Sequence, residues 1–159
     1  MKTTLLIFLG CIIGFCQAQT QSKRALFIGN SFTYYNNLPG MVAAIASSCG
    51  DELVYDASTG GGMGLENHVD NTTTLAKIAQ GNWDYVILQE RSQTPAFPED
   101  FVEANVYPYA ATLNNLIQTQ NPCAETAFFV TWAWQNGDPY NCEVFPPLCT
   151  YEGMDDLVT

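Results

Sequence analysis

The sequence is poor in positive charge. Its 159 residues include five lysine and arginine residues against 16 aspartate and glutamate residues, which gives a formal net charge of −11 at pH 7. Nucleic acids and anionic membrane surfaces attract proteins through clustered lysine and arginine. The charge balance therefore argues against both as partners, and the scattered acidic residues are interpreted as a solvated surface.

Metal-binding motifs are also missing, because the sequence has no CxxC spacing and its single histidine is His68. This argues against a metal site. Four cysteines follow the N-terminal segment, namely Cys49, Cys123, Cys142 and Cys149. In an exported protein this even number predicts disulfides, with three connectivities open. Cys142 and Cys149 bracket the short segment EVFPPL, so they are the favoured local pair.

The N-terminal segment contains the longest apolar run of the sequence. Lys2 precedes LLIFLGCIIGF, and CQA then offers a small-residue cleavage site before Gln19. This pattern is typical of a secretory signal peptide. A transmembrane anchor is the competing interpretation, but the run is shorter than the roughly 20 residues that cross a bilayer. A lipoprotein anchor at Cys11 or Cys16 is less favoured, because neither follows a convincing lipobox.

The rest of the chain is predicted to be one exported domain. Residues 1–18 are assigned to the signal peptide and residues 19–159 to the mature domain, since no repeat, linker or low-complexity tract marks another boundary. No later segment is apolar enough to span a membrane. We therefore expect a secreted or periplasmic protein without membrane association after signal cleavage.

The mature sequence alternates short β-rich runs with longer segments of helical spacing, the pattern of a parallel α/β sheet. The strand at 84–89 is so apolar that both of its faces should be buried. Pro108 should start or kink the last long helix. The segment 133–149 is predicted as a surface loop pinned by cysteine, and 150–159 begins like a helix. Predicted strands lie at 24–29, 52–57, 84–89 and 126–132, and predicted helices at 38–49, within 65–80 and at 101–120.

Chemically useful residues follow the predicted strands, where sites form in open parallel sheets. They supply a hydroxyl nucleophile, accessible backbone N–H groups and an amide donor, which are the parts that acyl transfer needs. Each is ordinary by itself, because Asn-Ser is common turn chemistry and a run of glycines is commonly a flexible loop. The segments are Gly29-Asn30-Ser31, Gly60-Gly61-Gly62, Gln89-Glu90, and the tryptophans Trp132 and Trp134.

Three stretches of the sequence resemble motif blocks of a known superfamily. FIGNSFT (27–33), GGMGLENH (61–68) and WDYVILQERS (83–92) are similar to the first three blocks of the SGNH (GDSL-type) hydrolases, in the form of a secreted branch. The match runs from Arg24 to about Trp134. The resemblance implies a three-layer α/β/α fold with a flavodoxin-like parallel sheet. It also implies esterase activity on acyl groups, frequently acetyl groups on carbohydrates, without a metal or organic cofactor.

The resemblance also implies catalytic roles for individual residues. Ser31 corresponds to the nucleophile, and its backbone N–H to one oxyanion donor. Gly62 corresponds to the second donor, with Gly61 as the alternative register. Gln89 falls at or near the position of the family's asparagine, which is a departure, since the longer amide would donate from a different point.

Substrate contacts are expected from Asn30, which stands where aspartate is commoner, and from His68 and Trp132. His68 matches a histidine of the second block, where a substrate-contacting or structural role is expected rather than that of the general base. The family's catalytic Asp-x-x-His block near the C-terminus has no counterpart here. The sequence is therefore interpreted as the N-terminal portion of such an enzyme, with the activating half of the site outside it.

The leading hypothesis is a serine esterase that acts on a small-molecule or carbohydrate ester through an acyl-enzyme on Ser31. The alternative is a non-catalytic carbohydrate-binding or surface protein that retains the fold, in which Trp132, Trp134 and Tyr140 stack on sugar rings. A nucleotide binder that uses TGGGMG (59–64) is disfavoured, because no cation lies nearby in the sequence and the chain is acidic.

Overall fold

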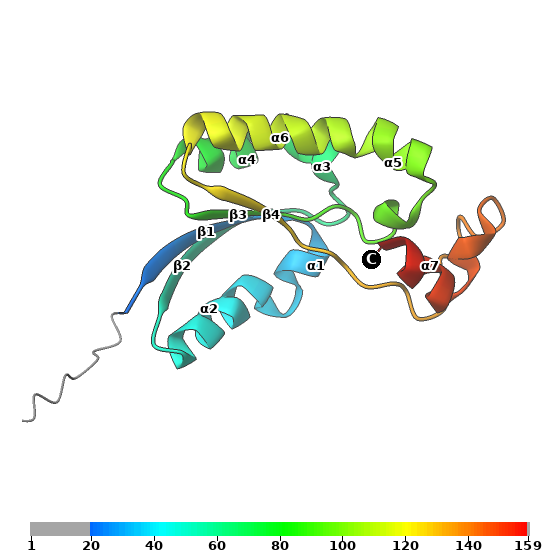
Figure 1. The fold of residues 1–159 in the computed structure, drawn as a ribbon, viewed down its shortest axis with the longest axis horizontal. Coiled ribbons are helices and arrows are strands. Elements are labelled where there is room, and N and C mark those ends of the chain that lie inside the picture. The colour runs from blue at the N-terminus through cyan, green and yellow to red at the C-terminus, as the bar shows by residue number, and fades with distance from the viewer. Residues whose placement is uncertain (1–19, 159) are drawn as a thin grey trace, which may run out of the picture.

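A single parallel sheet organises the chain. The computed structural model describes residues 20–158, and its four strands follow the order β2-β1-β3-β4 (Figure 1). Helices cover both faces of the sheet, which confirms the predicted three-layer α/β/α architecture. The strands are β1 Ser22–Gly29, β2 Glu52–Thr59, β3 Tyr85–Leu88 and β4 Glu125–Phe128. The predicted signal peptide, residues 1–18, lies outside the described residues.

The helices form two layers and a C-terminal group. On one face of the sheet lie α3 Leu65–His68, α4 Thr72–Ala79, α5 Glu99–Asn105 and α6 Tyr107–Gln120, and on the other lie α1 Ser31–Tyr34 and α2 Leu38–Ser48 (Figure 1). The last helix, α7 Tyr151–Val158, follows the long loop after β4. Three short 3-10 turns, η1 Tyr35–Asn37, η2 Thr94–Ala96 and η3 Pro146–Cys149, complete the elements. Within residues 20–158, none of the helices has the length and hydrophobicity needed to cross a bilayer.

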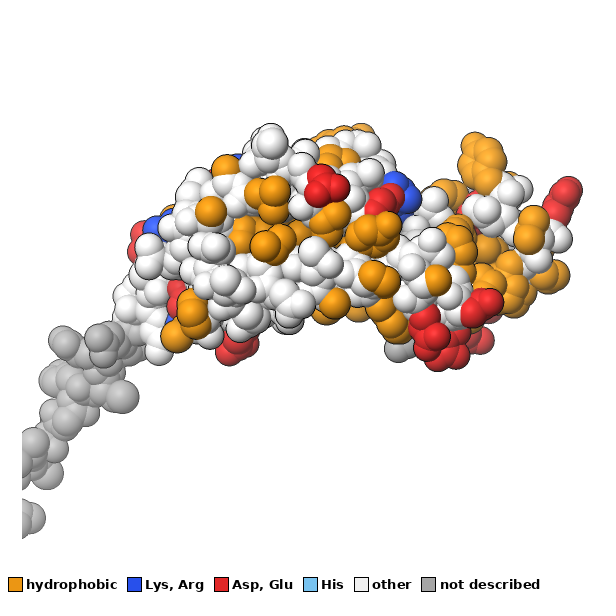
Figure 2. All heavy atoms as spheres, turned by 90° about the horizontal axis from the view of Figure 1, so that it is seen from above, with side chains coloured by type: hydrophobic (Ala, Val, Ile, Leu, Met, Phe, Trp, Pro, Cys, Tyr) orange, Lys and Arg blue, Asp and Glu red, His pale blue; other side chains and the backbone are white. Residues whose placement is uncertain are grey.

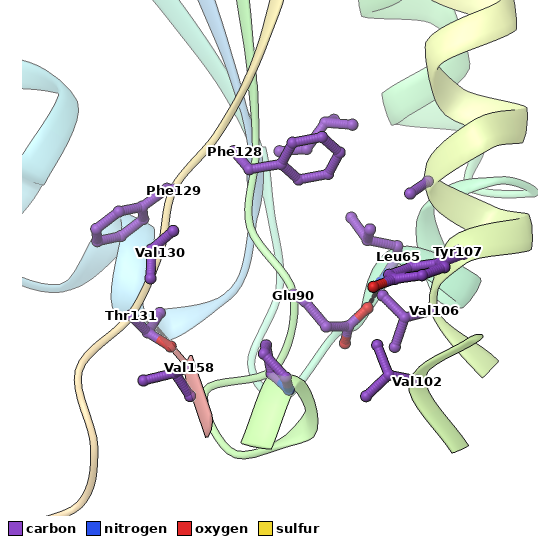
Figure 3. Close-up of a pocket in the computed structure, with 13 residues that line it drawn as sticks. Leu65, Glu90, Val102, Val106, Tyr107, Phe128, Phe129, Val130, Thr131 and Val158 are labelled. Carbon is purple, nitrogen blue, oxygen red and sulfur yellow. Dashed lines mark hydrogen bonds between the residues drawn. The ribbon is translucent and has the colours of Figure 1, made fainter. Parts of the chain in front are cut away.

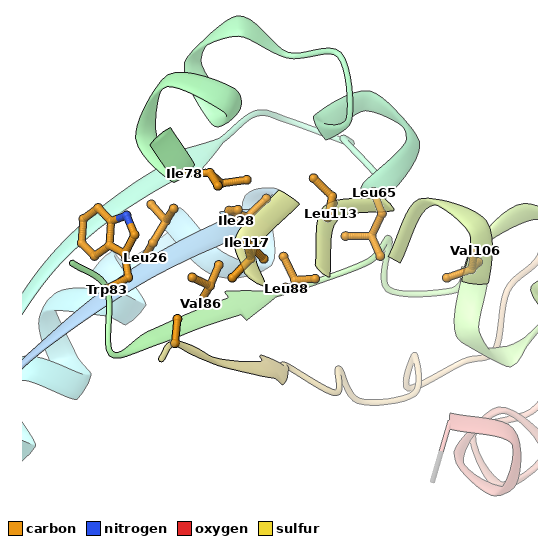
Figure 4. Packing of buried hydrophobic residues seen from close by; sticks show 11 residues of the cluster. Leu26, Ile28, Leu65, Ile78, Trp83, Val86, Leu88, Val106, Leu113 and Ile117 are labelled. Carbon is orange, nitrogen blue, oxygen red and sulfur yellow. The ribbon is translucent and has the colours of Figure 1, made fainter. Parts of the chain in front are cut away.

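The main core lies between the sheet and the layer of α3, α4 and α6 (Figure 4). Leu26 and Ile28 of β1 alternate with residues of the opposite face, and Leu88 of β3 packs beside them against Leu113 and Ile117 of α6. All five side chains are at most 1% exposed. Burying one such side chain contributes about 1.5–3 kcal/mol, so this layer fixes β1 and the residues that follow it.

The opposite face of β3 is only half-buried, at Tyr85 and Ile87, so the expectation that both faces are buried is wrong. Among the described residues, α2 is the long helix on this face, and it packs mainly against β2. Tyr85, Ile87 and Ala127 instead line an open groove of about 580 Å³.

Two predicted helices are each divided in the structure. The predicted helix at 101–120 breaks at Val106, whose φ of −120° and ψ of −53° leave the helical region. Pro108 lies in the first turn of α6, which confirms that it starts this helix. Similarly, Asn71 caps α4 by accepting a hydrogen bond from Thr74 N–H, and this separates α4 from α3.

The strand predicted at 126–132 ends earlier, at Phe128. Its ladder partner β3 ends at Leu88, and the last bond between them runs from Phe129 N–H to the Leu88 carbonyl. Residues 129–132 continue without a strand partner among the described residues.

A second, smaller core joins η2 to the segment after β4 and contains Ala96, Ala133, Leu148 and Met154. The disulfide between Cys142 and Cys149 closes the loop beside it, which confirms the predicted local pair. Cys49 and Cys123 are free and exposed, so the expectation of a second disulfide is wrong. Cys49 follows α2 and Cys123 follows α6, and these helices cover opposite faces of the sheet (Figure 1).

The acidic excess is visible on the surface. Acidic side chains gather at the end of the molecule that carries α7, while basic side chains are sparse on the face shown (Figure 2). Glu152, Asp155 and Asp156 lie on this helix.

Candidate functional site

Ser31 occupies the turn between β1 and α1. It is the first residue of α1 and lines a pocket of about 310 Å³ with Phe32, Tyr35, Asn36 and Trp132. Among residues 20–158, no hydrogen bond engages either the Ser31 hydroxyl or its backbone N–H. Ser31 is half-buried and lines this pocket, and its hydroxyl and backbone N–H both lack a partner among residues 20–158.

Asn30 holds this turn in place. Its Oδ1 accepts a hydrogen bond from Phe32 N–H at 3.1 Å, so it caps the N-terminus of α1. Its Nδ2 donates to the carbonyls of Met63 at 2.9 Å and Glu90 at 3.3 Å. Asn30 is 2% exposed. These contacts connect the ends of three strands and favour a positioning role over the predicted substrate contact.

Gln89 supports the turn from β3. Its Oε1 accepts hydrogen bonds from Asn30 N–H at 3.0 Å and from the Thr33 hydroxyl at 2.9 Å, and its Nε2 donates to the Glu90 carbonyl. The side chain is 1% exposed. All of its hydrogen bonds are internal, so the geometry favours positioning of the Ser31 turn over direct donation to an oxyanion.

His68 lies beneath the same turn and is completely buried. Its Nε2 is 3.0 Å from the Gly29 carbonyl, which can only accept, so Nε2 carries the proton and donates. Its Nδ1 then accepts from the Thr74 hydroxyl at 2.8 Å, and Thr74 is bonded in turn to Ser58. Both ring nitrogens are therefore engaged, which leaves neither available as a base for Ser31.

His68 and Gln89 both hydrogen-bond to the peptide unit between Gly29 and Asn30. The Gly29 carbonyl accepts from His68 Nε2, and the Asn30 N–H of the same peptide donates to Gln89 Oε1. This peptide joins Gly29 to Asn30 and lies one peptide unit before the bond to Ser31. β2 lies beside β1, but this adjacency brings His68 to the backbone rather than to the serine hydroxyl.

We expect His68 to make folding stability pH-dependent. Burial lowers the pKa of His68 below its ordinary 6.5. As the pH falls through 6.5 the unfolded chain takes up the proton first, so stability decreases until the folded His68 also titrates. The slope is at most about 1.4 kcal/mol per pH unit.

Urea unfolding of the native protein and His68→Gln at about pH 7.5 and about pH 5.5 measures this effect. The native protein should lose more stability than the variant over that interval. Equal losses in both would show that His68 does not bind its proton more weakly in the folded state.

The glycine-rich loop lies beside the Ser31 turn. Gly60 N–H donates to the Gly29 carbonyl at 3.3 Å, and Met63 N–H donates to the Gly60 carbonyl at 3.2 Å, which closes a tight turn. Gly62 has a φ of +68°, the left-handed conformation that the third residue of a type II turn requires. Gly61 and Gly62 N–H have no hydrogen-bond acceptor within residues 20–158, but these residues line a separate depression rather than the Ser31 pocket.

Two residues that the sequence hypothesis left without a role hold this loop. Glu90 accepts from Leu65 N–H at 2.9 Å, and burial raises the pKa of its carboxyl. Arg91 donates from Nε to the Gly62 carbonyl at 2.8 Å and also contacts Glu66. The available signal was their place directly after Gln89, at the carboxyl end of the third strand.

Of the three aromatic residues predicted to contact sugars, Trp132 lines the Ser31 pocket and the other two do not. It is 58% exposed, and its ring centroid lies 4.9 Å from that of Phe32. Trp134 donates to the Ser92 hydroxyl and packs on the second core. Tyr140 is 84% exposed on the disulfide-closed loop.

A separate apolar pocket of about 280 Å³ lies between the end of β4 and helices α5 and α6 (Figure 3). Glu90 lines it and extends toward the side chains of Tyr107 and Val106 (Figure 3). It shares no lining residue with the Ser31 pocket, although Thr131 on its wall directly precedes Trp132. The described residues hold no cluster of three or more His, Cys, Asp or Glu side chains suited to a metal ion.

Comparison with known proteins supports the fold. No family model and no curated protein matches the sequence. A DUF4886 family protein from Bacteroides uniformis superposes with a TM-score of 0.66 at 19% identity, over 84% of this chain and 58% of its own. A lipase/acylhydrolase from Enterococcus faecalis superposes with a TM-score of 0.53 at 14% identity, over 86% of this chain and 67% of its own. The protein therefore has the α/β fold of the SGNH (GDSL-type) hydrolases.

Proposed function

We propose that the protein is a serine ester hydrolase of the SGNH type and that Ser31 is its nucleophile. The observation that carries the proposal is the Ser31 turn itself, where a residue whose hydroxyl and N–H have no partner among residues 20–158 lines a pocket at the carboxyl end of β1. The peptide before Ser31 is held at both ends by buried side chains. Such a preorganised turn is what attack on an ester carbonyl requires.

In the proposed reaction, Ser31 Oγ bonds to the ester carbonyl carbon while its proton passes to a general base. The tetrahedral oxyanion accepts hydrogen bonds from Ser31 N–H and from the glycine-rich loop. The alcohol leaves with a proton, and water then hydrolyses the acyl-enzyme. Because His68 is engaged and no described residue hydrogen-bonds Ser31 Oγ, we place the base outside residues 20–158.

The pocket supports a carbohydrate ester as the substrate class. Trp132 and Tyr35 line it and are 58% and 70% exposed, so their ring faces are open to a sugar. An acetyl or other short acyl group would then be directed to Ser31. The Cys142–Cys149 disulfide is compatible with an extracellular or periplasmic location, which we propose for the protein.

Labelling with a fluorophosphonate tests the assignment. The folded protein expressed from its complete gene should form a stoichiometric adduct at Ser31, whereas Ser31→Ala should form none. Ser22→Ala, which removes an exposed serine at the start of β1, should label like the native protein. Folded native protein that hydrolyses esters but carries no adduct at Ser31 would sink the assignment.

A carbohydrate-binding protein without catalysis is the second candidate, favoured by the free state of Ser31 Oγ in residues 20–158. It predicts glycan binding that is lost in Trp132→Ala and unchanged in Ser31→Ala, with no ester hydrolysis. Hydrolysis by the native protein that disappears in Ser31→Ala would reject this candidate.

A further inference from the structure

Three oxygens from the glycine-rich loop and helix α3 converge on the Arg91 guanidinium. Nε donates to the Gly62 carbonyl at 2.8 Å, and one terminal nitrogen donates to Glu66 Oε1 and to Asn67 Oδ1, the latter at 3.1 Å. A guanidinium presents donors in a fixed planar fork, so it can bind several oxygens at once in a defined geometry. The Arg91 side chain therefore links the glycine-rich loop to the first turn of α3.

The Gly62 carbonyl is a sensitive point of the loop. The turn is tied at its start by Gly60 N–H to the Gly29 carbonyl and at its end by Met63 N–H to the Gly60 carbonyl. Between these bonds, the Gly62 carbonyl is held by Arg91 alone among the described residues. The Gly62 carbonyl shares its peptide unit with Met63 N–H, so loss of the Arg91 bond would loosen the hydrogen bond from Met63 to Gly60 that closes the turn, and with it the positions of the Gly61 and Gly62 N–H groups.

Arg91 is itself held from behind. Glu90 Oε1 accepts from Arg91 N–H at 2.6 Å, and Glu90 Oε2 accepts from Leu65 N–H at the start of α3. The Glu90 carbonyl also accepts from Asn30 Nδ2, at 3.3 Å. One short segment after β3 therefore contacts both the Ser31 turn and the glycine-rich loop, and it sets their relative positions.

We propose that Arg91 is a positioning residue that fixes the glycine-rich loop so that a free N–H of Gly61 or Gly62 is directed at the oxyanion formed at Ser31. The proposal rests on the proposed function, because it assumes acyl transfer at Ser31. Preorganised donors stabilise the transition state more than the bound ester. Loss of Arg91 should therefore lower kcat and leave KM nearly unchanged.

The test compares Arg91→Ala with Lys77→Ala in the protein expressed from its complete gene. Lys77 of α4 pairs with Asp56 of β2 and contacts no residue of the loop, so its removal deletes one paired cation but leaves the loop contacts intact. Arg91→Ala should reduce kcat about 100-fold. Guanidinium ion, added well below denaturing concentration, should restore part of that loss. The kcat of Arg91→Lys should fall between those of the native protein and Arg91→Ala. Lys77→Ala should keep the native kcat.

Hydrogen exchange of the loop amides supplies a readout that does not depend on activity. The hydrogen-bonded amides of Gly60, Met63 and Gly64 should exchange faster in Arg91→Ala, while those of α6 should keep their native rate. A native exchange rate in the loop would show that Arg91 does not hold the loop in place. Faster exchange with an unchanged kcat, or a loss of kcat that guanidinium does not restore, would overturn the role in catalysis. A native protein that neither labels at Ser31 nor hydrolyses esters would contradict the proposed function. The exchange data would still decide whether Arg91 holds the loop in place.

Discussion

Replacing Gly29 with alanine is expected to lower the free energy of unfolding by about 2–3 kcal/mol. A Cβ at this position would lie 2.6 Å from both Gln89 Oε1 and Thr33 Oγ1. Neither atom can withdraw freely, because Gln89 and Thr33 are 1% exposed and bonded to each other. The clash would also push the peptide before Ser31 away from its acceptor, so the rate of labelling at Ser31 should fall as well.

Chemical unfolding of Gly29→Ala and Gly61→Ala measures the effect. At Gly61 a new Cβ would meet only Tyr34 Oη, at 3.6 Å, which is an ordinary contact. The Gly61 variant should stay within about 0.5 kcal/mol of the native stability. If Gly29→Ala were equally stable, β1 and β3 would not approach as closely as described at the turn.

Gln89→Leu is expected to cost about 2–4 kcal/mol in stability, because it leaves two buried donors without an acceptor. These donors are the Asn30 N–H and the Thr33 hydroxyl, which both use Gln89 Oε1. The start of α1 would lose its support from β3, and Ser31 would react more slowly with a fluorophosphonate. Thermal and urea unfolding measure the first effect, and the labelling rate measures the second.

Gln118→Leu is the matched control, since it makes the same chemical change on the exposed side of α6. Gln118 donates to the Ala124 carbonyl at 3.0 Å, and water can replace it there. Its cost should stay below about 1 kcal/mol. Similar losses in both variants would mean that Gln89 holds the turn no more strongly than a surface amide holds its neighbour.

The sequence predicted the sheet and the place of Ser31 because both depend on local patterns. The apolar run 25–28 ends at Gly29, and a parallel strand presents the following residues at the carboxyl edge of the sheet. The same rule brought Trp132 to Ser31, although β4 ends four residues earlier than the predicted strand.

The internal roles of Gln89 and His68 could not be predicted in the same way. Amide and imidazole groups serve equally well as ligands of a substrate or as partners of buried backbone, and the sequence does not show which atoms they will meet. His68 meets the Gly29 carbonyl, 39 residues away, and Gln89 meets Asn30 N–H, 59 residues away. Arg91 was missed for the same reason, because its acceptor on Gly62 comes from a loop 29 residues earlier.

Trapping of the acyl-enzyme tests directly whether Ser31 is the nucleophile. The protein is mixed with p-nitrophenyl acetate, quenched with acid within the first turnover, and digested for peptide mass spectrometry, with Ser31→Ala treated in parallel. If Ser31 is the nucleophile, we expect one acetyl group on the peptide that contains it, formed together with a burst of nitrophenol. Ser31→Ala should give neither signal. Acetyl transfer to another residue, or hydrolysis that survives in Ser31→Ala, would contradict it.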